Sequence, residues 1–326
     1  MKARYRNAFF IFGIGILVLM LTQLDFHEVW SGLSHAGYWF LAVVALWGLL
    51  YMFNTSAWYI IIDSQRRSGE PRTVDFWWLY KVTVSGFALN YATPGGLMGG
   101  EPYRIMELTP RIGAEKATSS VILYVMTHIF SHFWFWLLCT IVYVVVRPVS
   151  LPMGLLLGAV AAFCLLAVWF FMAGYRKGIV VRLTGIIGSM PVLKNRMTPF
   201  LERHRNQFND IDRQVAALHR QSRRTFVAAV MLELGCRVCS ALEIMFILRV
   251  LSPHADFGDC LLILAFTTLF ANMLFFMPLQ IGGREGGFLM SATGLGLTAG
   301  TGAFVALIVR LRELVWTGVG MLLMKC

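Results

Sequence analysis

The architecture of this chain depends most on residues 76–108, which read FWWLYKVTVSGFALNYATPGGLMGGEPYRIMEL. The apolar first half is followed by Thr93-Pro94-Gly95-Gly96, and such a run ends a helix because proline cannot continue the hydrogen-bond ladder. A second glycine pair, Gly99-Gly100, precedes a short helical pattern that begins around Glu101 or Pro102, where proline suits the first turn. We therefore predict a broken helix with one arm on each side of these glycines.

Composition places the rest of the chain in a membrane. Of its 326 residues, 58% are hydrophobic and 14% are charged, whereas a soluble domain keeps about a quarter of its residues charged. At about 20 apolar residues per crossing, this length allows roughly seven to nine membrane segments and leaves no room for a separate soluble enzyme. We expect an all-α, polytopic membrane helix bundle that forms one domain over residues 1–326.

Eight apolar runs have the length and pattern of membrane helices. They cover residues 8–24, 37–62, 76–92, 118–146, 152–173, 226–251, 259–277 and 301–324. The first run follows Lys2, Arg4 and Arg6 but has no small-residue cleavage site, so we interpret it as a first anchor and not as a signal peptide.

The formal net charge of +11 comes from basic residues beside these runs. Such charge favours anionic lipid head groups on the cytoplasmic side over nucleic acid, which we do not expect as a partner. The most basic block, 174–225, is therefore a cytoplasmic linker between a first half, 1–173, and a second half, 226–326. The N-terminus then also lies in the cytoplasm, and the protein belongs in the inner, or cytoplasmic, membrane.

The linker contains apolar residues at three- and four-residue steps, a spacing that predicts an amphipathic helix along the inner membrane surface. A solvated linker helix is the alternative. The residues in register are Phe200, His204, Phe208, Ile211, Val215 and Leu218.

Counting membrane crossings outward from the linker places the loop at 147–151 outside and the turn at 63–74 inside. Because Arg104, Arg111 and Lys116 also indicate the inside, segment 76–92 begins and ends on the cytoplasmic side. A single full crossing cannot do this. We predict that the segment enters the membrane, breaks at the proline and glycines, and returns as a re-entrant hairpin.

The second half repeats this pattern weakly. The segment 259–277 returns toward the cytoplasm and meets Pro278-Leu-Gln-Ile-Gly282-Gly283-Arg284-Glu285, which matches the first break in its proline, its two glycines and its acid. Two interrupted segments in separate halves indicate a transporter's binding site. Asn90 and Asn272, shortly before each break, could hydrogen-bond either the unwound backbone or a ligand.

The residues around both breaks are suited to binding an anion. The backbone amides at a helix N-terminus attract phosphate, and Arg104, about one turn beyond Glu101, adds a bidentate clamp; a capped turn with Arg104 reaching the interface is the alternative. Arg284 and Glu285 could neutralise each other, or they could line a pathway with Arg310 of the last helix. The candidate substrate-binding residues are Gly99, Gly100, Glu101, Arg104, Gly282, Gly283, Arg284, Glu285 and Arg310.

Other polar residues lie inside apolar helices. His128 and His132 are four residues apart, and a proton relay with Asn90 and Asn272, or ordinary interhelical hydrogen bonding, suits them better than a metal, for which no third ligand is evident. Glu233 and Arg237 have the spacing of a structural ion pair. No nucleophile elbow, phosphate loop or dinucleotide motif occurs, so we predict no catalytic residues, no metal and no cofactor.

Both breaks resemble a flippase-like family built on the lysylphosphatidylglycerol synthase transmembrane region. Its members show a Gly-Gly-(Asp/Glu)-x-x-Arg stretch followed by a leucine, here Gly99 to Arg104 with Leu108, and a later Pro-x-x-x-Gly-x-Arg-Glu stretch, here Pro278 to Glu285. Arg310 also matches the family's final helix. The resemblance implies a bundle of about eight helices with re-entrant segments that moves lipids between leaflets.

The resemblance also bears on catalysis. Family members that synthesise aminoacylated lipid carry a further soluble domain after the membrane region, whereas this sequence ends at Cys326, so we do not expect that synthesis here. The function expected is that of a lipid flippase or transporter for a phospholipid or polyprenyl phosphate. The alternatives are a membrane-embedded lipid-phosphate transferase or hydrolase, and a non-catalytic lipid-binding partner of an envelope-synthesis complex. The partners expected are an anionic lipid substrate, membrane lipids, and either a second copy of the chain or an envelope-synthesis enzyme.

Overall fold

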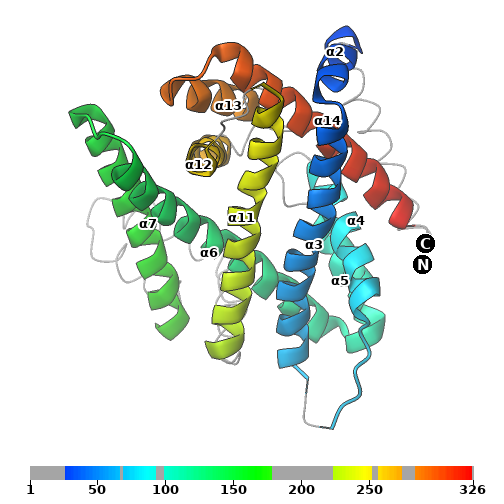
Figure 1. The fold of residues 1–326 in the computed structure, drawn as a ribbon. Coiled ribbons are helices and arrows are strands. Elements are labelled where there is room, and N and C mark those ends of the chain that lie inside the picture. The colour runs from blue at the N-terminus through cyan, green and yellow to red at the C-terminus, as the bar shows by residue number, and fades with distance from the viewer. Residues whose placement is uncertain are drawn as a thin grey trace, which may run out of the picture.

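The computed structural model describes residues 26–66, 69–92, 99–177, 223–251, 256–273 and 283–324. These residues form helices and no strand, which confirms the all-α prediction (Figure 1). The helices are α2 (Phe26–Ala36), α3 (Tyr38–Ser64), α4 (Phe76–Ala92), α5 (Gly100–Ile112), α6 (Ala114–Val146), α7 (Leu151–Lys177), α11 (Arg223–Leu251), α12 (Phe257–Met273), α13 (Gly283–Gly294) and α14 (Ala299–Leu323).

Each predicted apolar run within these ranges is a helix. The run at 8–24 and the predicted surface helix with Phe200 to Leu218 lie outside the described residues. Three described helices are long and apolar enough to cross a membrane, namely α3, α6 and the Leu151–Trp169 part of α7. Helices α11 and α14 have 29 and 25 residues, but each contains several charged side chains among its apolar residues.

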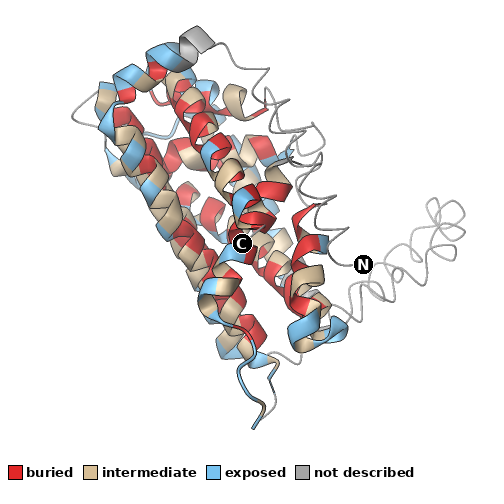
Figure 2. Cartoon of the chain, turned by 90° about the vertical axis from the view of Figure 1, so that its right-hand side faces the viewer, coloured by how far each residue is buried: buried red, intermediate tan, exposed pale blue. Residues whose placement is uncertain are grey.

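The outer surface of the bundle is apolar. On α7, at the left edge of Figure 1, Leu155, Leu165 and Trp169 are all more than half exposed. Figure 2 shows buried residues on the inward faces of the helices and partly or fully exposed residues on the outward faces. Large apolar side chains exposed over such an area suit contact with lipid, because water would penalise them.

Helices α4 and α5 form an antiparallel hairpin, here called hairpin 1. At its base the Arg111 guanidinium donates to the carbonyl of Thr73 over 3.1 Å, and at its tip the Gly100 amide donates to Asn90 Oδ1 over 2.8 Å. With 17 residues, α4 extends about 26 Å, which is less than the hydrocarbon thickness of a bilayer. Helix α5 runs back alongside α4, as the predicted re-entrant hairpin requires, and residues 93–98 between them lie outside the described residues.

Helices α12 and α13 form hairpin 2 in the same way. The hydroxyls of Thr267 and Ser291 lie 3.3 Å apart, and an added Cβ on Gly287 would lie 3.2 Å from the Thr267 Cα, so the two helices lie in close contact. Helix α12 also has 17 residues. The second interrupted segment is thus a half-length hairpin too, and α12 ends at Met273.

The two hairpins enter from opposite ends of the bundle. Helix α6 begins at Ala114, directly after hairpin 1, and Arg147 at its other end bonds Asp259 at the base of hairpin 2 with Nη2–O distances of 2.6 and 2.7 Å. These bonds and the charge of Asp259 raise the pKa of Arg147, so its guanidinium stays charged at this end of the molecule. The 33 residues of α6 separate the hairpin bases by roughly 50 Å.

The halves are related as an inverted repeat. Helices α3 and α11 run antiparallel side by side, since Trp39 contacts Phe246 while Asn54 contacts Cys236 (Figure 1). The order of helix, hairpin and long helix is the same in α3–α6 and α11–α14. The halves pack on each other reciprocally: the long helix α14 of the second half packs on α4 of hairpin 1, and the long helix α6 of the first half packs on α12 of hairpin 2. This arrangement is typical of transporters with inverted repeats.

Candidate functional site

The tip of hairpin 1 is held by Asn90. Its side-chain oxygen accepts from the Gly100 amide over 2.8 Å, and its nitrogen donates to Glu101 Oε1 over 2.9 Å. Gly100 has no room for a side chain, because an added Cβ would lie 2.2 Å from the Gly86 carbonyl oxygen. Asn90 was predicted to bond either the backbone at the break or a ligand, and it bonds the backbone just beyond the break. Asn90 thereby occupies the Gly100 amide, which is one of the backbone amides predicted to bind phosphate.

Arg104 is enclosed by hairpin 1 and its neighbours. Its side chain is 1% exposed, and it donates to Glu101 Oε1 over 3.3 Å and to the Thr83 carbonyl over 3.4 Å. Its guanidinium carbon lies over three aromatic rings, at 4.7, 5.3 and 5.8 Å from the ring centroids. Those rings belong to Phe87, Tyr124 and Trp58. In this conformation Arg104 therefore holds the hairpin together, and its predicted contact with phosphate would require the hairpin to open.

Hairpin 2 joins the last helix through two crossed ion pairs. Arg284 bonds Glu313, and Glu285 accepts from Arg310 Nη2 over 2.7 Å. The neighbouring residues Arg284 and Glu285 thus each take a partner from α14 in place of each other. Arg310 and Glu285 are the more open pair, with side chains 19% and 36% exposed. The structure therefore brings together the three charged site residues predicted at the start of α13 and the middle of α14, namely Arg284, Glu285 and Arg310.

A third arginine of this group is completely buried. Arg312 donates to both carboxylate oxygens of Glu243 over 2.8 and 3.1 Å, and its guanidinium carbon lies 3.8 Å from the ring centroid of Trp47. Its Nη1 forms a longer ion pair of 3.8 Å with Glu313 and has no hydrogen-bond partner in the described part of the chain. Through Arg312 and Glu313, the ion pairs between hairpin 2 and α14 are connected to the buried core of the bundle.

The end of α4 and the start of α13 both approach these charges. Tyr91, next to the last residue of α4, interacts electrostatically with Arg284, Arg312 and Glu313. Arginines and glutamates are equally numerous in this region, so the charges of its described residues balance. The two sets are Arg104, Arg237, Arg284, Arg310 and Arg312, and Glu101, Glu233, Glu243, Glu285 and Glu313.

The two histidines form part of a column of rings along α6. His128 lies 5.6 Å from His132, which in turn lies 5.3 Å from Trp136, measured between ring centroids. At one end His128 contacts Phe87 of hairpin 1, and at the other end Trp136 donates to Thr268 of hairpin 2 over 3.2 Å. The column therefore connects the hairpins through α6.

Glu233 and Arg237 interact electrostatically, but the predicted direct ion pair between them does not form. Glu233 accepts from His128 Nδ1 at 2.7 Å, while Arg237 donates to Ser131 Oγ and to the His128 carbonyl, each over 2.8 Å. Both side chains point from α11 to α6, where stronger partners than a helical neighbour are available. Glu233 Oε1 and His132 Nδ1 are buried without a hydrogen-bond partner in the described part of the chain.

Among the remaining predicted residues, Asn272 donates to the carbonyl of Thr268 in its own helix over 2.7 Å. Gly99 and Gly283 are buried beside the tips. Gly282 lies outside the described residues. The prediction of site residues missed Arg312, Glu243, Glu313 and Tyr91, although the presence of charges within apolar helices could have identified the first three.

Fold and site together define the protein as a polytopic α-helical membrane protein built from inverted halves, with broken helices meeting at a buried charged centre. The family model named lysylphosphatidylglycerol synthase TM region matches residues 8–320, and the protein belongs to this family. The family predicted from the two glycine motifs is therefore confirmed. Searches of curated proteins and of solved structures gave no match.

Proposed function

We propose that this protein moves a phosphate-containing lipid, of the phospholipid or polyprenyl-phosphate type, between the leaflets of the inner membrane. The observation that supports this most is the meeting of two inverted hairpins at the crossed pairs of Arg284 with Glu313 and Arg310 with Glu285. Helix breaks near the middle of the bilayer are where secondary transporters bind their substrates.

The crossed pairs suggest how the site would bind phosphate. A phosphodiester carries one negative charge and can accept bidentate hydrogen bonds from a guanidinium, so it can replace a carboxylate as the partner of Arg310 or Arg284. The released glutamate then needs a new partner or a proton. Glu285, 36% exposed, can meet either need more easily than Glu313, which is 7% exposed. We infer that Arg310 contacts the head group first.

Inverted halves also supply alternating access. If hairpin 2 opens toward its own end of the bundle while hairpin 1 stays closed, the charged centre faces one leaflet, and the reverse movement exposes it to the other. Both hairpin tips reach the same centre, so one site serves both leaflets. The acyl chains would remain in the bilayer outside the bundle, where the protein surface is apolar.

Reconstitution into vesicles tests the proposal. The purified protein should accelerate exchange of a fluorescent anionic phospholipid between leaflets, and Arg310→Gln should slow this exchange at least about tenfold, because a charge-assisted contact is lost. Arg249→Gln is the matched control, since Arg249 is an exposed arginine at the far end of α11. Equal exchange by Arg310→Gln and wild type, or no exchange above that of empty vesicles with any phosphate lipid, would contradict the proposal.

The hydrogen bond of 2.7 Å between His128 and Glu233 favours a second candidate, a membrane-embedded transferase or hydrolase acting on a lipid phosphate. A histidine oriented by a carboxylate is a common general base. In that case His128→Ala or His132→Ala would abolish formation of product from a lipid phosphate, whereas Arg310→Ala would retain some. Leaflet exchange with no change in the lipid would exclude this candidate.

A further inference from the structure

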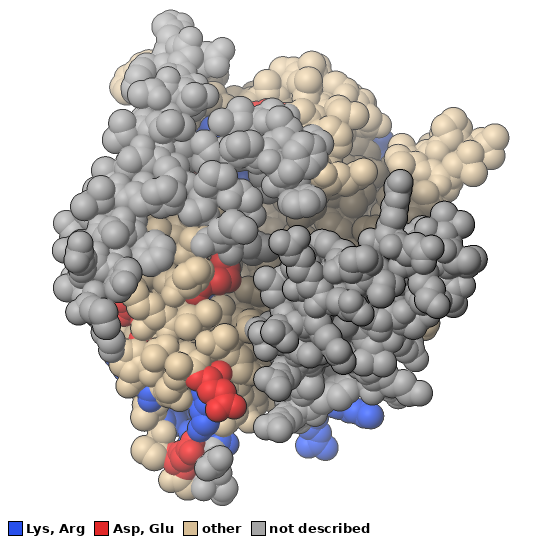
Figure 3. Space-filling view, turned by 180° about the vertical axis from the view of Figure 1, so that it is seen from behind, with Lys and Arg blue, Asp and Glu red and all other residues tan. Residues whose placement is uncertain are grey.

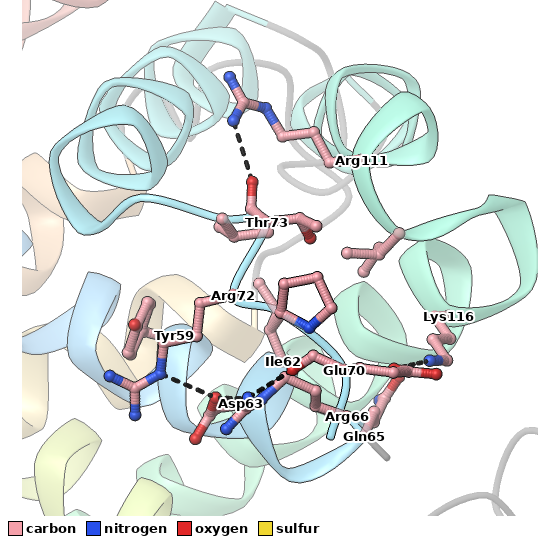
Figure 4. Close-up of a pocket in the computed structure, with 13 residues that line it drawn as sticks. Tyr59, Ile62, Asp63, Gln65, Arg66, Glu70, Arg72, Thr73, Arg111 and Lys116 are labelled. Carbon is pink, nitrogen blue, oxygen red and sulfur yellow. Dashed lines mark hydrogen bonds and ion pairs between the residues drawn. The ribbon is translucent and has the colours of Figure 1, made fainter. Parts of the chain in front are cut away.

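A cavity of about 270 Å³ lies at the base of hairpin 1, far from the charged centre. Three segments surround it: the last turn of α3, the connector over residues 69–75, and the turn between α5 and α6 (Figure 4). Both ends of hairpin 1 therefore contribute to its wall. This base lies at the bottom of Figure 3, which shows most of the visible Lys and Arg side chains at that end of the molecule.

The cavity has an excess of positive charge. Among the described residues, it is lined by four cations, Arg66, Arg72, Arg111 and Lys116, and by two acids, Asp63 and Glu70. Arg66 and Arg72 share Asp63, with N–O distances of 3.1 and 3.6 Å, and Lys116 bonds Glu70 over 2.8 Å.

Arg111 pairs with no carboxylate in the described part of the chain. It donates to the Thr73 carbonyl over 3.1 Å, and its guanidinium carbon lies 3.8 Å from the ring centroid of Trp78. Arg72 is also open, with a side chain 64% exposed. Two guanidinium groups therefore have hydrogen-bond donors available beside one cavity, which a single anion can use.

Aromatic residues indicate the level in the membrane at which the cavity lies. Tyr59 lines it, Trp78 stacks on Arg111, and the adjacent Trp77 is 60% exposed. Tryptophan and tyrosine concentrate at the level of the lipid head groups, because their rings are apolar and their polar atoms need water. By the positive-inside rule, this end of the bundle faces the cytoplasm.

From this cavity we infer a second binding site, which takes the phosphate of an anionic phospholipid of the inner leaflet. Basic pockets between helices on the cytoplasmic side bind such head groups. The size fits, because pockets that enclose whole drug-sized ligands begin at about 300 Å³, so this one holds a head group and leaves the acyl chains outside. The site does not depend on the transport proposed above.

A lipid phosphate bound here would also stabilise hairpin 1. Arg72 belongs to the connector that enters the hairpin, and Arg111 belongs to the helix that leaves it. A phosphate that accepts from both guanidiniums would bridge the two arms at their base, beside the existing bond from Arg111 to Thr73. The lipid would thus act as a clamp on the hairpin whose tip reaches the charged centre.

Native mass spectrometry of protein released from nanodiscs tests this site. Nanodiscs of phosphatidylcholine with added phosphatidylglycerol should yield wild-type protein that retains phosphatidylglycerol. In Arg72→Gln with Arg111→Gln the apparent affinity for this lipid should fall at least about tenfold, because both available cations are lost. Arg224→Gln, an exposed arginine of the same end in the first turn of α11, should retain the lipid as wild type does.

Two further measurements make the test decisive. In phosphatidylcholine alone the double variant should still unfold in one transition, lowered only by the lost contacts of Arg111 with Thr73 and Trp78, which shows that the substitutions do not unfold the protein. An excess of inorganic phosphate should not displace the lipid. Undiminished retention of phosphatidylglycerol by the folded double variant would overturn the site, and displacement by inorganic phosphate would overturn its assignment to a lipid.

Discussion

Replacing Gly100 by alanine tests whether hairpin 1 is closed as described. The added Cβ would lie 2.2 Å from the Gly86 carbonyl oxygen and 2.7 Å from Asn90 Oδ1. Neither atom can move alone, because the carbonyl belongs to the α4 backbone and the Asn90 side chain bonds both Gly100 and Glu101. Helix α5 must therefore shift away from α4 by about 1 Å to reach an ordinary contact.

The cost follows from these contacts. Overpacking of this kind costs about 1–3 kcal/mol, and weakening the bond from the Gly100 amide to Asn90 adds about 1 kcal/mol. The helix preference of alanine over glycine returns at most about 1 kcal/mol. We expect Gly100→Ala to be destabilised by about 1–3 kcal/mol, and the bond from Asn90 to Glu101 to weaken with the shift.

Thermal unfolding of the purified protein in detergent measures this effect. Gly158→Ala is the matched control, because Gly158 is also a helical glycine but its added Cβ meets nothing within 4 Å. The control should therefore unfold at the same temperature as wild type or slightly above it, whereas Gly100→Ala should unfold below it. If both variants unfold together, α4 and α5 are not in the close contact that hairpin 1 requires.

Three further outcomes are expected. Glu243→Gln should destabilise the protein by about 3–5 kcal/mol in thermal unfolding, since it leaves the buried charge of Arg312 uncompensated; a loss below about 1 kcal/mol would contradict the pairing. Asp259→Asn should cost less than about 1 kcal/mol in the same assay, because its pair with Arg147 is partly exposed, and a larger loss would mean that this end is buried. In a cysteine-free background, Leu297→Cys and Arg72→Cys should react with an impermeant thiol reagent from opposite sides of the membrane; labelling from the same side would exclude inverted hairpins.

The hairpins could be predicted from sequence because their cause is local. Proline and paired glycines interrupt the helix wherever they occur in an apolar run, and the basic residues at 63–74 and from Arg104 to Lys116 fix both ends of the first segment on one side. The entry of hairpin 2 from the opposite end agrees with the predicted return of segment 259–277 toward the cytoplasm, because the preceding loop at 252–258 has no Lys or Arg to hold it inside.

The partners of the charges could not be predicted in the same way. Spacing along one helix favoured Glu233 with Arg237, but helix α11 also faces α6, and His128 is the nearer partner. Arg312 and Glu243 are 69 residues apart, so their pairing depends on how α11 and α14 are rotated against each other. Sequence indicates that charges in apolar helices need partners, whereas the choice of partner depends on packing.

The distribution of these bonds determines which hairpin can move. Both hydrogen-bond acceptors of Arg104 belong to hairpin 1, so this hairpin carries its own charge balance and moves, if at all, as a unit. Hairpin 2 instead balances its charges with α14, through pairs that a phosphate can replace.

A lipid phosphate that takes Arg310 should therefore loosen hairpin 2 without loosening hairpin 1. Hydrogen exchange should then increase over 283–294, and not over 100–112, when the protein is moved from phosphatidylcholine into anionic lipid. An increase confined to 100–112 would reverse this assignment, because hairpin 1 would then be the element that opens when the substrate binds.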